Sequence, residues 1–177
     1  MAEQKAQGSL FRPSETQLAY LAGVVDSDGY ITINESRRKG AIYHAPQVGI
    51  TGTRPQPHHL AASFWGGKVS VYHPKLTGHR PQFQWSRQGG AAACIIAALL
   101  PYLLVKSDQA LTALELWQHI EDGRSEDAFP WFGASYDPVA ERCELRQQMI
   151  ALNQSRSRLR GGRTSNGDIC YAQVEAL

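Results

Sequence analysis

The sequence is poor in the features that mark secreted, membrane-spanning and zinc-stabilised proteins. Its N-terminus, MAEQKAQGSL, lacks the apolar core of a secretory signal. The most apolar stretch, residues 91–105, is too short to cross a bilayer and contains Pro101. Only three cysteines occur, and none has the CxxC spacing of a zinc ribbon. We therefore expect no membrane partner, a reducing intracellular location (cytoplasm, organelle or nucleoid), and a free, buried thiol at Cys94.

Acidic residues are scarce in the middle of the chain. Between Gly29 and Ser107, nine Lys and Arg stand against a single acid, Glu35, a net charge of +8. The flanking segments are acidic, so the whole chain carries only +2. A basic block of this kind is typical of polyanion binding, and chance clustering of surface charge is the alternative.

The first helix is marked by its start signals and by two apolar faces. Ser14 and Gln17 have the spacing of a capping box, and Gly29 is expected to supply the exit turn. Ala19 and Gly23 form a second face of small residues, which permits close approach of another helix. The main apolar stripe consists of Leu18, Leu21, Ala22 and Val25.

After this helix the apolar period changes from helical to two, which predicts strands near 30–36, 41–53, 67–74 and 81–87. A short helix is expected between the second and third strands, at 55–65, and further helices at 91–105, 107–123 and 138–153. The fold class is therefore α+β, with the order αββαββα followed by two more helices. We expect a flexible N-terminus at 1–12, one domain at 13–163 and a C-terminal tail at 164–177.

The outward faces of the predicted strands carry amides, hydroxyls and basic groups rather than acids. Such side chains hydrogen-bond base edges and phosphates, and a β-ribbon fits the major groove of DNA. The predicted reading residues are Tyr30, Thr32, Asn34, Arg37, Arg38, Gln47, Thr51, Lys68, Ser70, Tyr72, Gln82 and Gln84.

Two acids, Asp26 and Asp28, lie at the C-terminal end of the first helix, where the helix dipole disfavours negative charge. A divalent cation would offset this unfavourable interaction, and carboxylates and carbonyls are the hard oxygen ligands that Mg²⁺ prefers. A simple turn is the alternative, since Asp-Ser-Asp-Gly is good turn chemistry. An EF-hand is excluded, because Gly29 stands at the wrong position of the loop.

The stretch LAGVVDSDG, residues 21–29, resembles the LAGLIDADG motif of homing endonucleases, with six of nine positions identical. The similarity extends over about residues 14–163, and the single motif resembles the homodimeric type. It implies a saddle-shaped four-stranded antiparallel sheet lying in the major groove, with helices on one face. It also implies a C₂ dimer, because cutting two strands requires two acidic sites.

The resemblance also implies roles for individual residues. Asp28 would hold Mg²⁺ together with the Ser27 carbonyl, with Mn²⁺ or Ca²⁺ as substitutes in binding, and Asp26 would serve helix termination. Lys106 would polarise the water network near the scissile phosphate. Arg54 and His58 occupy the region of further catalytic residues, although the glutamine that the family has there is not preserved. The implied dimer interface is Ala19, Leu21, Ala22 and Gly23. The implied phosphate contacts are Ser155, Arg156 and Arg158.

The sequence thus predicts an intron-encoded, Mg²⁺-dependent endonuclease without a small-molecule substrate. It would cut both strands of a long pseudo-palindromic DNA duplex across the minor groove and leave short 3′ overhangs. A non-cleaving binder on the same fold, such as an RNA-splicing maturase or a regulator, is the alternative. A calcium-binding or purely structural domain leaves the basic block unexplained.

Overall fold

The computed structural model describes residues 12–74, 80–123 and 138–160, and the side chains of 156–160 are not described. The element order confirms the predicted α+β class, with four strands and the order αββαββα before two further helices. The elements are α1 (Glu15–Asp28), β1 (Gly29–Arg38), β2 (Ala41–Gly52), α2 (Gln56–Trp65), β3 (Ser70–Tyr72), β4 (Gln82–Gln88), α3 (Gly90–Leu99), the 3₁₀ turn η1 (Leu100–Tyr102), α4 (Ser107–Asp122) and α5 (Pro138–Arg160).

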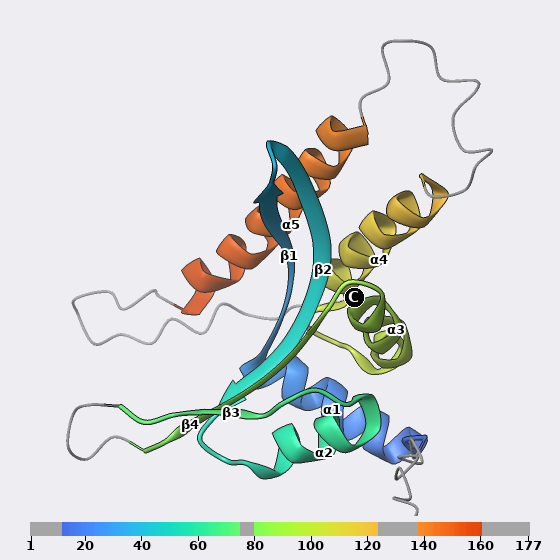
Figure 1. Cartoon of the computed structure of the whole chain (residues 1–177). Coiled ribbons are helices and arrows are strands. Elements are labelled where there is room, and N and C mark those ends of the chain that lie inside the picture. The colour runs from blue at the N-terminus through green and yellow to red at the C-terminus, as the bar shows by residue number, and fades with distance from the viewer. Residues whose placement is uncertain (1–11, 75–79, 124–137, 161–177) are drawn as a thin grey trace, which may run out of the picture.

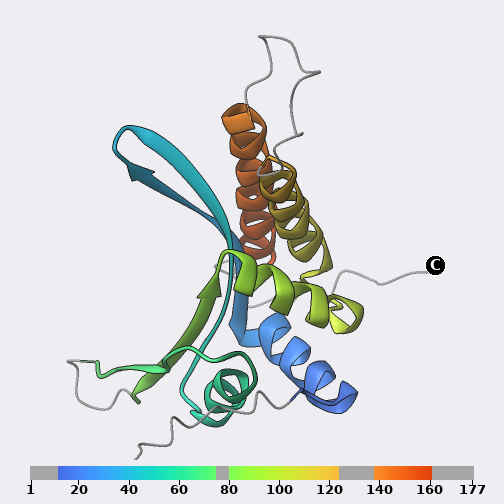
Figure 2. The same ribbon diagram turned by 45° about the vertical axis from the view of Figure 1, so that its right-hand side comes forward.

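The four strands form one antiparallel sheet in the order β1-β2-β4-β3. The sheet is strongly curved, and α1, α3, α4 and α5 lie on one side of it (Figure 1). Figure 2 shows the opposite side of the sheet facing away from these helices. A half-covered antiparallel sheet has an apolar face and a polar face, and here the polar face is the open one.

The hydrophobic core lies between the covered face of the sheet and the helices. The sheet contributes side chains at alternate positions, including Ile31, Val48 and Trp85, which are at most 1% exposed. Leu21 and Val25 of α1 pack against them from the helical side. This core fixes the face of every central strand, because a shift of one residue would expose its apolar set.

The start and the end of α1 follow from specific residues. Ser14 and Gln17 form the predicted capping box: the Ser14 N–H donates to Gln17 Oε1 at 2.8 Å, and the Gln17 N–H donates to Ser14 Oγ at 3.3 Å. Gly29 does not make the expected left-handed turn, since its φ is −94° and it begins β1. A Cβ on Gly29 would lie 2.6 Å from the Val25 Cα and 2.7 Å from the Gly49 carbonyl oxygen. Glycine is needed here for close packing rather than for a positive φ.

Several details differ from the sequence-based expectations. β3 has only three residues, all exposed, and Val71 among them is 46% exposed rather than buried. α3 ends at Leu99, because Pro101 permits only a short 3₁₀ turn after it. Cys94 is a free thiol but is exposed rather than buried.

α5 is longer than expected and continues to Arg160. Within the described residues, no helix is long and apolar enough to cross a membrane. Most of the predicted flexible N-terminus and all of the predicted C-terminal tail lie outside the described residues, so the domain limits stay predictions.

Candidate nucleic-acid interface and active site

The C-terminal end of α1 is held by a reciprocal contact with the segment before α4. The Asp26 carboxylate accepts the backbone N–H groups of Leu104, Val105 and Lys106 at 2.8, 3.0 and 2.9 Å. In return, Lys106 Nζ donates to the backbone carbonyls of Val25 and Asp26 at 2.6 and 2.5 Å. The ammonium group thus stands at the negative end of the helix dipole, where a cation is favourable. Asp26 has the structural role predicted for it, but through partners almost eighty residues away.

Asp28, the last residue of α1, is exposed and lines a cavity. The cavity has a volume of about 280 Å³ and is also lined by Thr51, Arg54 and His58. The Thr51 hydroxyl donates to the Asp28 carbonyl at 3.2 Å, which ties the end of α1 to the end of β2. The structure therefore brings together three of the four predicted catalytic residues, Asp28, Arg54 and His58.

Lys106 and Ser27 are not among the residues that line this cavity. Lys106 instead binds the carbonyls of the last turn of α1, two and three residues before Asp28. The Ser27 hydroxyl is exposed and donates to the Val24 carbonyl at 3.2 Å.

His58 is a buried residue of α2, only 1% exposed. Its Nδ1 lies 2.9 Å from the Arg54 carbonyl, and because a carbonyl oxygen can only accept, Nδ1 carries the proton. Burial lowers the pKa of His58, while the hydrogen bond to the Arg54 backbone opposes the shift. His58 is therefore a neutral imidazole at neutral pH and supplies no positive charge to the cavity. The basic residue that lines this cavity is Arg54, which is exposed.

The strand register places the predicted outward residues side by side on the open face of the sheet. Cross-strand pairing aligns Thr32 with Gln47 and Gln47 with Gln88. Farther along, Gln84 of β4 pairs with Thr51 on one side and Ser70 on the other. The face is a continuous surface of amides and hydroxyls across all four strands.

Three of these side chains form a hydrogen-bond chain. Asn34 Nδ2 donates to Gln47 Oε1, and Gln47 Nε2 donates to the Tyr30 hydroxyl at 3.1 Å. The Tyr30 ring covers Gly49, where a Cβ would come within 2.5 Å of the ring. These contacts fix the direction of the Gln47 amide before any ligand binds.

Not every predicted reading residue lies on this face. Arg37 shares the parity of Ile31 and Ile33, so it lies on the opposite face of β1, where its Nε is 3.4 Å from Glu35 Oε1. The prediction failed because it treated Arg37 and Arg38 as a pair in a hairpin tip, whereas β1 continues through Arg38. Lys68 is exposed but precedes β3.

Three polar residues of the open face were missed, namely Ser36, Tyr43 and Gln88. The same two-residue period, extended to the true strand ends, would have found them.

The predicted dimer surface is smaller than expected. Leu21 and Ala22 are 0% exposed because they pack in the core of the single chain, so they are not available to a second copy. Ala19 and Gly23 are exposed on α1 and flank Tyr20, which is 50% exposed. A Cβ on Gly23 would meet nothing within 4 Å, so nothing in the single chain requires glycine there.

Of the predicted phosphate contacts, Ser155 is exposed on α5, and its hydroxyl donates to the Leu152 carbonyl at 3.0 Å. The side chains of Arg156 and Arg158 lie outside the described residues, although the helix backbone includes both.

The donor chemistry at Asp28 fits a hard divalent cation. No group of three or more His, Cys, Asp or Glu able to hold a metal ion occurs in residues 12–74, 80–123 and 138–160. The available oxygen ligand is the Asp28 carboxylate, next to the backbone carbonyls that end α1. Mg²⁺ is commonly bound by one or two carboxylates, with waters and substrate phosphates completing its shell. One carboxylate per chain is therefore compatible with Mg²⁺ when waters and a substrate phosphate complete its shell.

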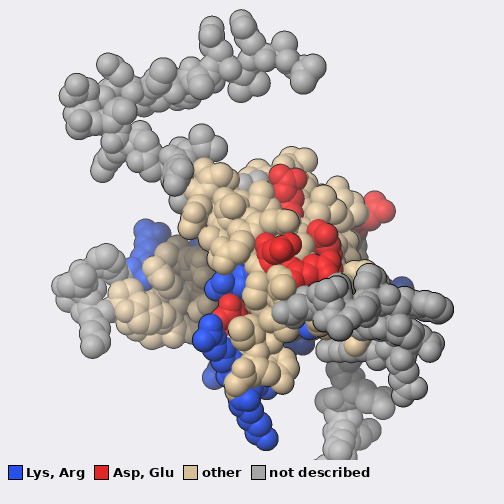
Figure 3. All heavy atoms as spheres, turned by 90° about the horizontal axis from the view of Figure 1, so that it is seen from above, with Lys and Arg blue, Asp and Glu red and all other residues tan. Residues whose placement is uncertain are grey.

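Charge is unevenly distributed over the surface. Seen from above, acidic side chains gather in a patch, and the basic side chains lie outside it (Figure 3). α4 and α5 carry exposed acids, among them Glu115, Glu121, Glu141 and Glu144. The helical side is thus unsuited to a polyanion, whereas the open face of the sheet carries no acid among its described outward residues.

The curved antiparallel sheet with one open polar face, and the helices on its other side, form a fold that solved homing endonucleases share. Solved structures of such enzymes are similar to this chain. The homing endonuclease I-CvuI, in complex with its target, is 19% identical with a TM-score of 0.57, over 77% of this chain and 82% of that one.

Two further structures agree. The group I intron-encoded I-CeuI, complexed with DNA, is 12% identical with a TM-score of 0.55, over 78% of this chain and 68% of that one. I-TnaI is 14% identical with a TM-score of 0.53, over 80% of this chain and 97% of that one. No sequence profile of a known family matches the chain, and no curated protein matches it either. The likeness therefore confirms the predicted resemblance at the level of the fold.

Proposed function

We propose that this chain is a site-specific DNA endonuclease that uses Mg²⁺ and acts as a homodimer on a long pseudo-palindromic duplex. The observation that carries the proposal is the position of Asp28. This exposed residue lines a cavity together with Arg54, at the end of the helix that leads directly into the open polar sheet. The fold shared with homing endonucleases solved in complex with DNA supports it.

The open face of the sheet would bind the duplex. Amide side chains such as Gln47 and Gln84 can donate to and accept from base edges in the major groove, which carries a distinct pattern for each base pair. The hydrogen bonds from Asn34 and to Tyr30 orient the Gln47 amide, so less side-chain entropy is lost on binding. The basic groups of the 29–107 segment would supply the sequence-independent attraction to phosphates.

The Asp28 carboxylate and the Ser27 carbonyl would hold Mg²⁺, with Mn²⁺ or Ca²⁺ able to occupy the same place. When bound, the metal lowers the pKa of a water and stabilises the leaving oxygen of phosphodiester hydrolysis. The Thr51 hydroxyl holds the end of α1 at a fixed position beside β2. Arg54 would contact the scissile phosphate, because it is the exposed cation of the cavity.

Lys106 would act on the site through its charge and through the helix end that it clamps. Its ammonium neutralises the last carbonyls of α1 at Val25 and Asp26. This lowers the electrostatic cost of the Asp28 carboxylate at the same helix end.

A second copy of the chain would supply the second acid. The small residues Ala19 and Gly23 on the exposed face of α1 permit two such helices to approach closely across a twofold axis. Two Asp28 carboxylates would then serve the two DNA strands.

The test is binding followed by cleavage. Duplexes selected by the protein from a randomised library are incubated with it in Mg²⁺ and in EDTA, and the ends of any fragments are sequenced. We expect selected duplexes to be cut on both strands in Mg²⁺ and left intact in EDTA. Binding without cutting in Mg²⁺ would contradict the endonuclease and favour the non-cleaving binder, and an RNA library run in parallel detects a maturase-type preference.

A further inference from the structure

The outer section of the β1–β2 hairpin extends beyond the rest of the sheet. β4 pairs with β2 from Gln47 to Gly52, whereas β1 and β2 remain paired as far as Arg38 and Ala41. No third described strand joins this outer section, and Figure 2 shows it projecting away from β4. A two-stranded ribbon is only marginally stable alone, so its direction depends on what supports it from the side.

The covered face of this outer section is mainly polar, with the half-buried Ile42 as its apolar member, unlike that of the inner section. Where the inner strands turn Ile31, Ile33 and Val48 to the core, the outer strands turn Glu35 and His44, which form a cross-strand pair. Little apolar surface is therefore buried here, and the specific contacts between the outer hairpin and α5 are polar.

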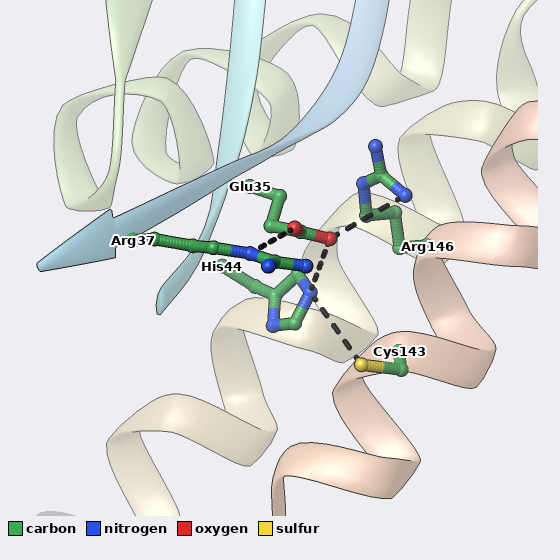
Figure 4. Close-up of polar contacts among 5 residues, drawn as sticks. All are labelled: Glu35, Arg37, His44, Cys143 and Arg146. Carbon is green, nitrogen blue, oxygen red and sulfur yellow. Dashed lines mark hydrogen bonds and ion pairs between the residues drawn. The ribbon is translucent and has the colours of Figure 1, made fainter. Parts of the chain in front are cut away.

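These contacts centre on the Glu35 carboxylate (Figure 4). Glu35 Oε2 lies 3.6 Å from Arg146 Nη1 of α5 and 3.9 Å from His44 Nε2. Glu35 Oε1 accepts from Arg37 Nε at 3.4 Å. Cys143, one turn before Arg146 on α5, places its Sγ 3.9 Å from the same His44 nitrogen. We call these five residues the hairpin latch.

The latch is not a second active site. Cys143 and Glu35 both approach Nε2 of His44, whereas a relay requires the carboxylate and the nucleophile on opposite ring nitrogens. The His44 side chain is 0% exposed, so no substrate reaches it. Burial lowers the pKa of His44, with Glu35 opposing the shift and Arg146 and Arg142 adding to it.

Glu35 is the acid that holds these cations together, and it is the single acid between Gly29 and Ser107. Replacing its carboxylate would leave Arg37 and Arg146 close together beside a buried imidazole. Removal of one partner from a partly buried ion pair is costly because the other charge loses its compensation. The outer hairpin would then move away from α5 rather than keep its position.

We propose that Glu35 is a positioning residue that sets the direction of the outer hairpin and thereby the reading of the outermost base pairs of each half-site. The side chains that depend on it are on the opposite face of the same strands: Ser36, Arg38 and Tyr43, all exposed. The inner reading residues, such as Gln47 and Gln84, lie where β2 and β4 are paired, so they do not depend on the latch. This inference rests on the proposed function.

The first measurement needs no DNA. Hydrogen–deuterium exchange is compared for the wild type, Glu35→Gln and Glu144→Gln, the last being an exposed acid on α5 outside the latch. We expect Glu35→Gln to raise exchange at least tenfold within residues 34–45 and to leave β4 and α1 unchanged. Unchanged exchange at 34–45, or an increase spread over the whole molecule, would overturn the latch.

The second measurement is the base preference at each position of DNA selected by the same proteins. With Glu35→Gln, the four bases at the outermost positions of each half-site should be selected with frequencies that differ by no more than about twofold. The inner positions should keep their wild-type base preference. Arg146→Met should reproduce this profile, and Arg146→Lys, which keeps the cation, should restore most of it. A profile unmoved by Glu35→Gln, or a uniform loss at all positions, would overturn the inference alone. A wild type that selects no sequence would overturn the proposed function and this inference with it.

Discussion

Asp26 and Lys106 bind each other's backbone. The Asp26 carboxylate accepts the Lys106 N–H at 2.9 Å, and the Lys106 ammonium donates to the Asp26 carbonyl at 2.5 Å. The pair joins the end of α1 to the start of α4. The Lys106 ammonium also offsets the unfavourable interaction between an acid and the negative end of the helix dipole. Of the two aspartates in the motif, Asp26 thus has a structural role, and Asp28 is the one that can bind a ligand.

The two aspartates should separate stability from activity. Asp26→Asn weakens three charge-assisted hydrogen bonds, so we expect the free energy of unfolding to fall by about 2 kcal/mol. Asp28→Asn relieves an unfavourable charge at the helix end, so stability should stay the same or rise by about 0.3–1 kcal/mol. Urea unfolding of both variants checks this. Equal destabilisation by the two changes would contradict the assignment.

Lys106→Met should destabilise the fold by about 1.5–3 kcal/mol, because two backbone carbonyls lose a charged donor. The matched control is Lys68→Met, since Lys68 is exposed and lies outside any described helix or strand. Chemical denaturation is the measurement. If Lys106→Met unfolds at the same urea concentration as the control, the clamp at the end of α1 contributes nothing.

Two glycines of the motif should respond in opposite ways to alanine. Gly29→Ala would place a Cβ 2.6 Å from Val25 Cα, so we expect a loss of at least about 1–3 kcal/mol from overpacking. Gly23→Ala meets nothing in the single chain and should add about 0.5–1 kcal/mol to monomer stability through helix propensity. If α1 forms the dimer interface, the same Gly23→Ala change should weaken dimerisation in analytical ultracentrifugation. A dimer of unaltered affinity would place the interface elsewhere.

The two buried histidines predict acid sensitivity. Burial lowers the pKa of His44 and of His58 below the ordinary value of 6.5. The unfolded chain therefore binds more protons in this range, and stability falls as pH drops through 6.5 until the lowered folded pKa values are passed. At His44, burial is the main cause of the lowered pKa. The Glu35 carboxylate raises this pKa, and the Arg146 and Arg142 guanidinium groups lower it further.

Unfolding free energies measured between about pH 7.5 and 5 test this linkage. The double variant His44→Gln/His58→Gln should flatten the pH dependence relative to the wild type. His73→Gln, at an exposed histidine after β3, is the control for loss of a histidine as such. A slope that the double variant leaves unchanged would contradict the account.

Local patterns predicted the fold well, because each carries its own physical cause. The capping box at Ser14 and the alternation around Ile31 and Val48 depend on neighbouring residues only, and both are confirmed. The limits of strands are less local. β3 is cut to three residues, and β1 extends through Arg38, because pairing with another strand decides where a strand ends.

The site shows the same division. Asp28, Arg54 and His58 were predicted from a resemblance and lie together in one cavity. The burial of His58 could not be predicted, since it depends on how α2 packs against the sheet. Leu21 and Ala22 belong to the main apolar stripe of the helix, and the resemblance assigned them to an interface. Only the three-dimensional packing shows which face the core of the single chain already uses.

The central claim is that Asp28 is the acid that holds a catalytic metal for DNA cleavage. The direct measurement is single-turnover cleavage of one selected duplex in Mg²⁺ by the wild type and by Asp28→Asn, with the affinity of each for that duplex measured in Ca²⁺. We expect Asp28→Asn to bind within about tenfold of the wild type, a change of about 1.4 kcal/mol, and to produce no cut strand. Cleavage by Asp28→Asn at the wild-type rate would contradict it.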